Sequence, residues 1–183
     1  IGWLSQISPE RARRAMRAQA VTKLSYLKRL AAKIKLPLVL EWADEFLTGS
    51  DGKLILFATH CNVIAEIKQR YGNTAVVIDG SVVGRKRQLA ADQFQLDPRV
   101  RVLAGNLKAA GVGLGLTAAS AVAFAELGWH PGGHIQAEDR AHRIGQSKKI
   151  MVVYFAARGT VEEKLLKLIQ KKNKVLSATL DGS

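Results

Sequence analysis

The stretch LILFATHCNVIAEIKQRYGNTAVVI, residues 54–78, indicates the class of the fold. It begins with an apolar run, Leu54–Phe57, continues through a helical stretch near Cys61–Tyr71, and ends in a second apolar run, Val76–Ile78. Both runs are continuously apolar rather than alternating, which is typical of strands that are buried on both faces of a parallel sheet. Two such strands joined by a helix predict a right-handed βαβ unit.

The same alternation continues toward the C-terminus. Further β-rich runs occur at Val100–Leu103, Val122–Phe124 and Ile150–Tyr154. Helical stretches lie between them, near Gly84–Gln95 and His134–His142. We therefore expect an α/β protein with a mostly parallel central sheet and helices on both faces. Ligands of such sheets gather beyond the carboxyl ends of the strands, which directs attention to four segments: residues 59–60, 79–81, 105–115 and 126–131.

Helical patterns precede and follow this region. Ser8-Pro9-Glu10 favours a helix start, and the spacing predicts one apolar face, formed by Ala12, Met16, Ala20, Leu24, Leu27, Ala31 and Ile34. A weaker pattern covers Leu38–Leu47 and stops at Gly49. We expect residues 1–49 to be a helical extension that packs on one structural unit, residues 50–183. Thr160–Glu163 predicts a capping box for a last helix, with Leu165, Leu168, Ile169 and Leu176 pointing inward.

Length and composition bound the protein class. A chain of 183 residues with 48% hydrophobic residues has room for one ordinary domain with a real core. The single cysteine, Cys61, excludes an internal disulfide framework and a zinc cage of several cysteines, which favours a reducing compartment. We see no signal peptide, and the longest uncharged run, residues 109–125, is broken by glycines and is too short for a membrane helix. We expect a soluble protein.

The charge is strongly unbalanced. There are 28 Lys and Arg against 15 Asp and Glu, a formal net charge of +13, which attracts polyanions such as nucleic acid or an anionic membrane face. Residues 1–36 hold Glu10 as their one acid and nine basic residues, Arg11, Arg13, Arg14, Arg17, Lys23, Lys28, Arg29, Lys33 and Lys35. Two interpretations stay open for them: a solvated helix face, or part of the surface that binds the polyanion.

The sequence contains only part of the motifs that ATP hydrolysis requires. The phosphate-binding pattern GxxxxGK(S/T) is absent, so we expect that this chain does not hydrolyse ATP alone. Asp44-Glu45 resembles a magnesium-binding pair, but the helical spacing around it favours a solvated helix face. The glycine-rich segment Ala109–Thr117 follows a strand, where glycines serve either close phosphate approach or tight packing.

Gln136–Gln146, QAEDRAHRIGQ, places two arginines on one helix face. Arg140 and Arg143 are three residues apart, and Gln136 lies one turn earlier. Paired guanidinium groups suit the charge that develops in phosphoryl transfer, the role of an arginine finger. A structural salt bridge to Glu138 or Asp139 explains the spacing equally well.

Taken together, these motifs resemble the Swi/Snf-type ATPases, a branch of helicase superfamily two. QAEDRAHRIGQ, with AAGVGLGLTAA at residues 109–119 and Trp129-His130-Pro131 before it, is similar to motifs five and six of that family. FATH at 57–60, IDGS at 78–81 with Arg87, and Gln93-Phe94 are similar to its fourth-motif region. FAEL at 124–127 is most similar to the annealing-helicase and fork-remodelling branch. The similarity spans about Lys53–Lys172.

The resemblance implies a RecA-like, three-layer lobe, the C-terminal one of two in an ATP-dependent translocase on double-stranded DNA. ATP and Mg²⁺ would be bound mainly by an N-terminal lobe that carries the phosphate loop, and this lobe alone would be inactive. Its partners would be that N-terminal lobe and double-stranded or branched DNA, with no membrane, and the fragment would be monomeric. The parent would be nuclear in a eukaryote, or in the cytoplasm or nucleoid of a prokaryote or phage. The alternative is a standalone basic DNA-binding domain.

Individual roles follow from position in the motifs. Arg140 and Arg143 would be the arginine fingers, with Gln136 and Asp139 orienting their helix or joining the nucleotide site and with Gly111 and Gly113 forming a loop that faces the cleft. DNA phosphates would lie near six residues, Thr59, His60, Gly80, Ser81, Arg87 and Lys108. The sequence departs from many relatives at Asn106-Leu107, where they have Ser-Thr, and at Gly115, where they have Asn.

Two other features favour structural roles. His130 and His134 are four residues apart, but Pro131-Gly132-Gly133 between them is expected to prevent a helix, which argues against a metal pair. Trp129 is expected to shape the turn before the arginine helix.

Overall fold

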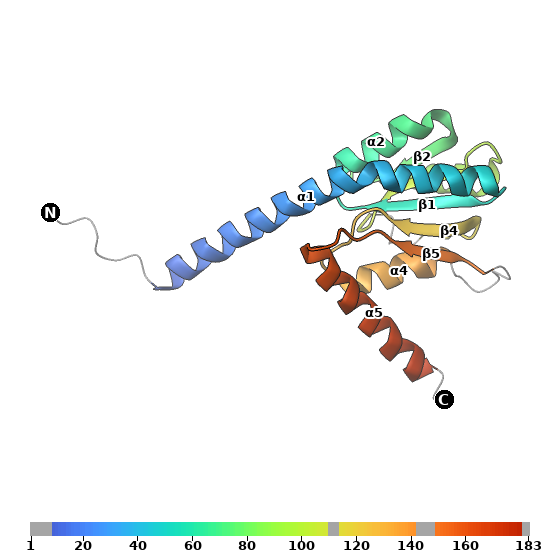
Figure 1. The fold of residues 1–183 in the computed structure, drawn as a ribbon. Helices are drawn as coiled ribbons and strands as arrows, with labels where there is room; N and C mark the ends of the chain where they lie inside the picture. The colour runs from blue at the N-terminus through green and yellow to red at the C-terminus, as the bar shows by residue number, and fades with distance from the viewer. Residues whose placement is uncertain (1–8, 110–113, 142–148, 181–183) are drawn as a thin grey trace.

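A five-stranded, parallel β-sheet forms the centre of the molecule in the computed structural model, which describes residues 9–109, 114–141 and 149–180 (Figure 1). The strands lie in the order β2-β3-β1-β4-β5, and each neighbouring pair is parallel. Their bounds are β1 Lys53–Ala58, β2 Ala75–Ile78, β3 Val102–Asn106, β4 Ala119–Phe124 and β5 Met151–Tyr154. The predicted RecA-like fold class is thus confirmed. For the elements between β1 and β5, the predicted ends differ from the observed ones by up to three residues.

Helices cover both faces of this sheet. On one face, α1 (Pro9–Gly49) and α2 (Cys61–Tyr71) pack on alternate side chains of the strands, such as Leu54 and Leu56 of β1. On the other face, α3 (Arg85–Leu96), α4 (Pro131–Ala141) and α5 (Val161–Leu180) pack on the side chains between them, such as Ile55 and Phe57. A short 3₁₀ turn, η1 (Gly72–Thr74), joins α2 to β2.

The N-terminal helical region differs from the sequence prediction. The sequence pattern runs to Ile34 and repeats more weakly over Leu38–Leu47, and the structure joins both parts in one helix of 41 residues with Pro37 inside it. The missing N–H of Pro37 removes one helical hydrogen bond, and the burial of Leu36 and Val39 on either side favours continuity. Figure 1 shows the N-terminal part of α1 projecting away from the sheet.

The predicted apolar face of α1 is mostly wrong: among its described members, Ala31 alone is buried. Met16, Leu27 and Ile34 are 71%, 54% and 70% exposed. The face that packs on the sheet instead consists of Ala31, Ala32, Leu36, Val39 and Ala43, with Lys28 and Lys35 buried beside them. Helical periodicity alone could not find this face, because two of its members are lysines. The division into residues 1–49 and 50–183 stays a prediction.

Two predictions, about the start of α4 and about the buried face of α5, also need correction. The helix α4 begins at Pro131, so Pro131–Gly133 does not prevent a helix; proline fits the first helical position because its missing N–H has no helical partner there. In α5, Leu165 and Ile169 are buried as predicted, but Leu168 is 54% exposed, and the side chain of Leu176 lies outside the described residues.

At the start of α5, Thr160 acts as the cap. Its hydroxyl accepts a hydrogen bond from the backbone N–H of Glu162 at 3.2 Å, while the Glu162 carboxylate accepts one from the N–H of Ala157 at 2.9 Å.

The described residues lack two kinds of feature. Among them, no helix combines the length and the apolar character that crossing a membrane requires. Within the same ranges, no group of three or more His, Cys, Asp or Glu side chains is arranged to hold a metal ion.

Candidate nucleic-acid interface

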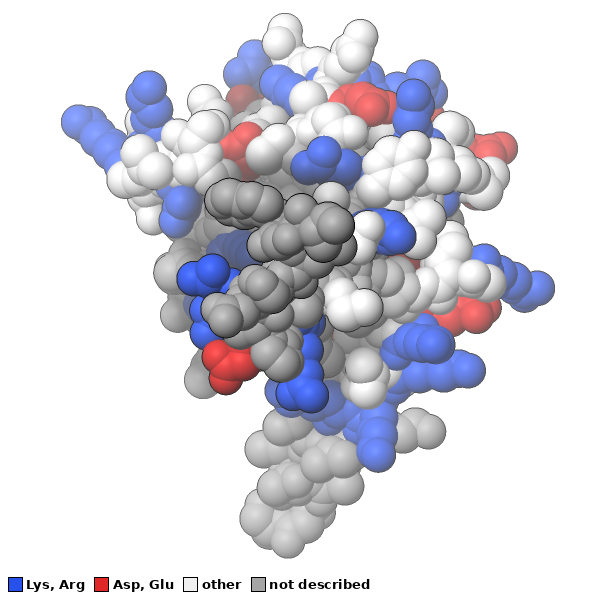
Figure 2. All heavy atoms as spheres, turned by 90° about the vertical axis from the view of Figure 1, so that its left-hand side faces the viewer, with Lys and Arg blue, Asp and Glu red and all other residues white. Residues whose placement is uncertain are grey.

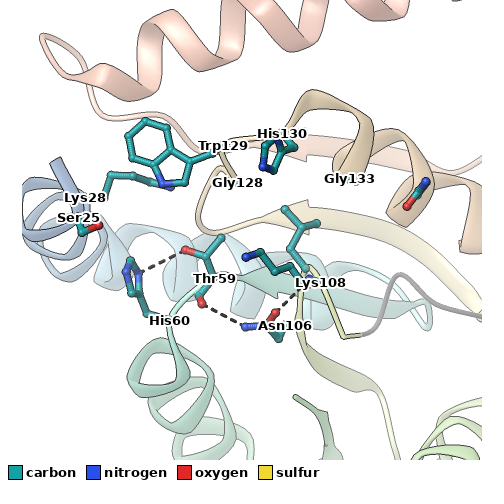
Figure 3. A pocket seen from close by; sticks show the side chains of 12 residues that line it. Ser25, Lys28, Thr59, His60, Asn106, Lys108, Gly128, Trp129, His130 and Gly133 are labelled. Carbon is teal, nitrogen blue, oxygen red and sulfur yellow. Dashed lines mark hydrogen bonds between the residues drawn. The ribbon is translucent and has the colours of Figure 1, made fainter. Parts of the chain in front are cut away.

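A cavity of about 630 Å³ opens at the carboxyl edge of the sheet (Figure 3). Three strand ends converge on it, those of β1, β3 and β4, and the helices α1 and α4 close its sides. Its lining consists of Ser25, Lys28, Thr59, His60, Asn106, Leu107, Lys108, Gly128, Trp129, His130, Gly133 and Gln136. This is the edge at which parallel sheets bind ligands, because loops and helix N-termini meet there.

Glu126 is a buried residue that holds two of the residues lining the cavity. Its side chain is 1% exposed, and its Oε2 accepts hydrogen bonds from the backbone N–H groups of Thr59 and His60, both at 2.8 Å. Its Oε1 contacts Nδ1 of His60. One carboxylate at the end of β4 therefore holds the chain at the end of β1, where α2 starts.

Asn106 makes a second brace, between β1 and β3. Its Nδ2 donates to the carbonyl of Thr59 at 3.1 Å, and its Oδ1 accepts from the backbone N–H of Lys108 at 3.0 Å. The next residue, Leu107, is buried against Gly128, where an added Cβ would lie 2.6 Å from Leu107 Cδ2. The departure from Ser-Thr at these two positions thus supplies a bridging amide and a packed side chain.

Lys28 reaches the cavity from α1. It is 3% exposed, its Nζ donates to the carbonyl of Leu127, and the same Nζ lies 4.7 Å from the centre of the Trp129 ring. Burial lowers the pKa of Lys28, and the negative charge of Glu126 opposes that change. Lys28 is therefore a structural cation, which fixes the segment between β4 and α4.

Lys35 fastens α1 at a second point. Its Nζ lies 2.7 Å from both carboxylate oxygens of Glu162 and donates to the carbonyl of Phe155, also at 2.7 Å. Burial lowers the pKa of Lys35, and the charge of Glu162 partly offsets the effect. Neither interpretation of the basic N-terminal region accounts for these two lysines. The other seven are exposed, and Lys and Arg outnumber acids on the face in Figure 2.

The helix α4 runs from the rim of the cavity and carries part of the sixth motif. His134, Ala137 and Ala141 are buried, Arg140 is half-buried, and Gln136 and Asp139 are exposed. The carbonyl of Arg140 accepts a hydrogen bond from the N–H of Leu116 at 3.0 Å, which ties the end of the glycine-rich segment to this helix. Glu138 contacts the hydroxyl of Tyr154, and burial raises the pKa of Glu138.

His134 has a structural role. Its Nε2 accepts a hydrogen bond from the N–H of Gly128 at 3.1 Å, its Nδ1 lies 3.3 Å from the carbonyl of His130, and its ring packs on Phe124. Because Nε2 accepts, the proton of the neutral ring is on Nδ1. Burial lowers the pKa of His134, which favours this neutral form.

The structure brings some of the predicted site residues together and separates others. Thr59, His60, Lys108 and Gln136 line the cavity. Gly80, Ser81 and Arg87 do not: Ser81 bonds to Asp79 in the turn after β2, and Nε of Arg87 donates to the carbonyl of Val82. Gly111, Gly113 and Arg143 lie outside the described residues. The roles assigned to all these residues stay predictions.

The structure gives site roles to residues that the sequence analysis did not assign to the site. Lys28 gave no signal beyond its charge, because its partner, Leu127, is 99 positions away. Glu126 did carry a signal, since it is an acid directly after the apolar run Val122–Ala125. Trp129 forms part of the cavity wall as well as of the turn before α4.

A parallel sheet layered between helices, with a cavity at its carboxyl edge and an arginine-bearing helix on the rim, is the arrangement of a RecA-like lobe. Residues 37–145 match the helicase conserved C-terminal domain. The chain belongs to this helicase family, and within it to the Swi/Snf-type, annealing-helicase branch that the motifs resemble.

Relatives in both sequence and structure agree with this assignment. The chain is 40% identical over 151 residues to the DNA annealing helicase and endonuclease ZRANB3 of Mus musculus, covering 79% of this chain and 14% of that protein. It is 39% identical over 148 residues to the SWI/SNF-related matrix-associated actin-dependent regulator of chromatin subfamily A-like protein 1 of Xenopus tropicalis, covering 79% and 16%. The crystal structure of the C-terminal part of the Fun30 ATPase domain superposes with a TM-score of 0.67 at 25% identity, covering 74% of this chain and 44% of that one.

Proposed function

We propose that this chain is the second motor lobe of an ATP-dependent translocase on double-stranded DNA. The chain spans about one seventh of the length of the curated relatives it matches, so the activity belongs to a larger assembly. Its partner would be an N-terminal RecA-like lobe, which would bind most of the ATP and Mg²⁺. Support comes from the family, from relatives named as DNA annealing helicases, and from the absence of a phosphate-loop pattern in these 183 residues.

The observation that carries the proposal is the cavity at the carboxyl edge. Hydroxyl, imidazole and ammonium groups of Thr59, His60 and Lys108 reach it from two adjacent strand ends. Such groups contact backbone phosphates without reading base sequence, which a motor that moves along DNA requires. Because β2 lies beside β3, the track would continue along the same edge to Gly80, Ser81 and Arg87.

The nucleotide would bind on the α4 side. In the proposed arrangement, Arg140 and Arg143 approach the γ-phosphate held by the first lobe, Gln136 and Asp139 support them, and Gly111 and Gly113 face the same cleft. The hydrogen bond between Leu116 and Arg140 supports a coupled loop and helix. A lobe without the phosphate loop would be inactive alone, and the parent would be nuclear in a eukaryotic source.

The decisive experiment is DNA-stimulated ATP hydrolysis by the full-length parent. Arg143→Ala should abolish turnover while duplex DNA binding is kept, because the arginine stabilises charge that develops only in the transition state. Arg99→Ala is the matched control, since Arg99 is exposed and pairs with Asp97 at the opposite edge of the sheet. Unchanged turnover in Arg143→Ala would refute the finger assignment.

A second candidate is a standalone DNA-binding domain, favoured by the seven exposed basic residues of α1. Tight, salt-sensitive duplex binding by the 183-residue chain, together with a parent that does not hydrolyse ATP, would support it over the motor.

A further inference from the structure

Glu126 combines deep burial with a direct link to the proposed DNA surface. Its carboxylate is 1% exposed, and each of its oxygens contacts a donor near the end of β1. His60, by contrast, has an 18% exposed side chain and lines the cavity. The pair therefore connects the interior of the lobe to the surface where phosphates would bind.

The contact with Glu126 decides which nitrogen of His60 holds a proton. An ionised carboxylate can only accept hydrogen bonds, so the Nδ1 atom that faces it must donate. Nε2 is then the ring nitrogen left to meet a ligand, and once protonated it donates to an anion. The other charged or titratable groups that line this cavity are Lys28, Lys108 and His130. Of these, Lys108 is an exposed cation, which would attract an anion to the same cavity.

We propose that Glu126 is a positioning residue, which holds the His60 imidazole through Nδ1 so that the charged ring donates its Nε2–H to a DNA backbone phosphate. This inference rests on the proposed function, because it takes DNA as the ligand of the cavity. The buried carboxylate orients the ring and balances the imidazolium charge, so that the Nε2–H of the charged ring is held toward the phosphate.

A purely structural role for Glu126 is the rival explanation. His60 is the N-cap residue of α2, and its own side chain makes no capping bond. Glu126 accepts the N–H groups of Thr59 and His60, as a capping group supplied from β4 would. The test must therefore include a measurement that capping alone does not change.

The first measurement determines the tautomer of His60. Long-range ¹H–¹⁵N correlation spectra of the 183-residue chain report it, at a pH high enough for histidine rings to be neutral. In the unmodified chain we expect the proton on Nδ1. Glu126→Gln keeps the size and an acceptor for the backbone, but its amide N–H groups can face Nδ1 and so favour the proton on Nε2. His134 is an internal control, because the Gly128 N–H keeps its proton on Nδ1 in both chains. The same His60 tautomer in both chains would overturn the proposal.

The second measurement is the affinity of the full-length protein for a blunt duplex DNA near pH 6.5. His60→Gln should weaken binding about tenfold, the effect of one charge-assisted hydrogen bond. Glu126→Gln should weaken it less, because the His60 ring then meets the phosphate as a neutral donor. The double variant should be no weaker than His60→Gln alone, because Glu126 acts only through the His60 ring. Additive losses would mean that Glu126 acts independently of His60, and would contradict the inference.

The two levels of failure are distinguishable. If the unmodified protein binds duplex DNA and His60→Gln binds equally well, the inference fails and the proposed function stands. If the unmodified protein binds no duplex DNA, both fail. Circular dichroism of each variant separates loss of contact from loss of fold, and His60→Gln, which leaves Glu126 in place, provides a variant in which the β4 carboxylate still caps α2.

Discussion

Gly52 shows how a single side-chain position governs the junction between α1 and β1. A Cβ at this residue would lie 2.8 Å from Cβ of Ser120 in β4 and 3.2 Å from the ring of Phe46 in α1. Ser120 Cβ is fixed by the strand backbone, so it cannot move aside as the end of a long side chain could. The turn therefore needs glycine for space, since no positive φ is involved.

We expect Gly52→Ala to lower the free energy of unfolding by about 1–3 kcal/mol, the usual cost of overpacking a filled site. Chemical denaturation of the 183-residue chain measures this. Gly49→Ala is the matched control three residues earlier, where an added Cβ meets nothing within 4 Å, and it should be close to neutral. Equal effects of the two substitutions would contradict the steric explanation.

At the scale of elements, α1 is attached to the rest of the lobe by lysines as well as by apolar packing. Lys35 and Glu162 form an ion pair whose side chains are 9% and 1% exposed, and this pair joins α1 to the start of α5. Removing one partner of a buried pair leaves an uncompensated charge, which costs more than removing both.

Lys35→Met should therefore destabilise the chain by about 3–5 kcal/mol, because it leaves the Glu162 carboxylate without its cation. Adding Glu162→Gln should restore part of the loss in thermal or urea unfolding. Lys33→Met, at an exposed position of the same helix, should change stability by less than about 0.5 kcal/mol. A double variant as unstable as the sum of the single ones would show that the two side chains are not coupled.

The same element shows what the sequence could and could not predict. The strands were predictable because Leu54–Phe57 and Val122–Phe124 are continuous apolar runs, which only a sheet covered on both faces explains. The face of α1 was not, because Lys28 and Lys35 bind carbonyl or carboxylate groups about a hundred or more positions away. In the site, Thr59, His60 and Lys108 follow strand ends and were predictable, whereas the contact between His60 and Glu126 spans 66 positions and has no local pattern.

For the whole molecule, the net charge of +13 divides into parts with different roles. Lys28 and Lys35 are buried and structural, while Lys108 is exposed at the cavity. In the proposed function, only exposed cations near the DNA track neutralise phosphates and so displace counterions from the DNA. The slope of log K against log salt concentration therefore reports how many such cations contact the DNA.

Lys108→Gln should weaken duplex DNA binding by the full-length protein and reduce the slope of log K against log salt concentration by about 1. Arg99→Gln removes the same charge at the opposite edge of the sheet and should leave the slope unchanged. Titrations at several salt concentrations provide the measurement. A slope that responds equally to both changes would indicate general charge attraction rather than a track at the carboxyl edge.

The two lysine attachments also give α1 a mechanical property. Lys28 and Lys35 hold the helix at the loops after β4 and β5, and residues 9–27 extend beyond these points. At 1.5 Å per residue, that segment is about 28 Å long. The segment is fixed at one end, where Lys28 contacts the wall of the cavity. A tilt of about 10° at this attachment moves the residue-9 end by about 5 Å. Through Lys28, a force on that end thus acts on the segment that carries Trp129 and leads into α4.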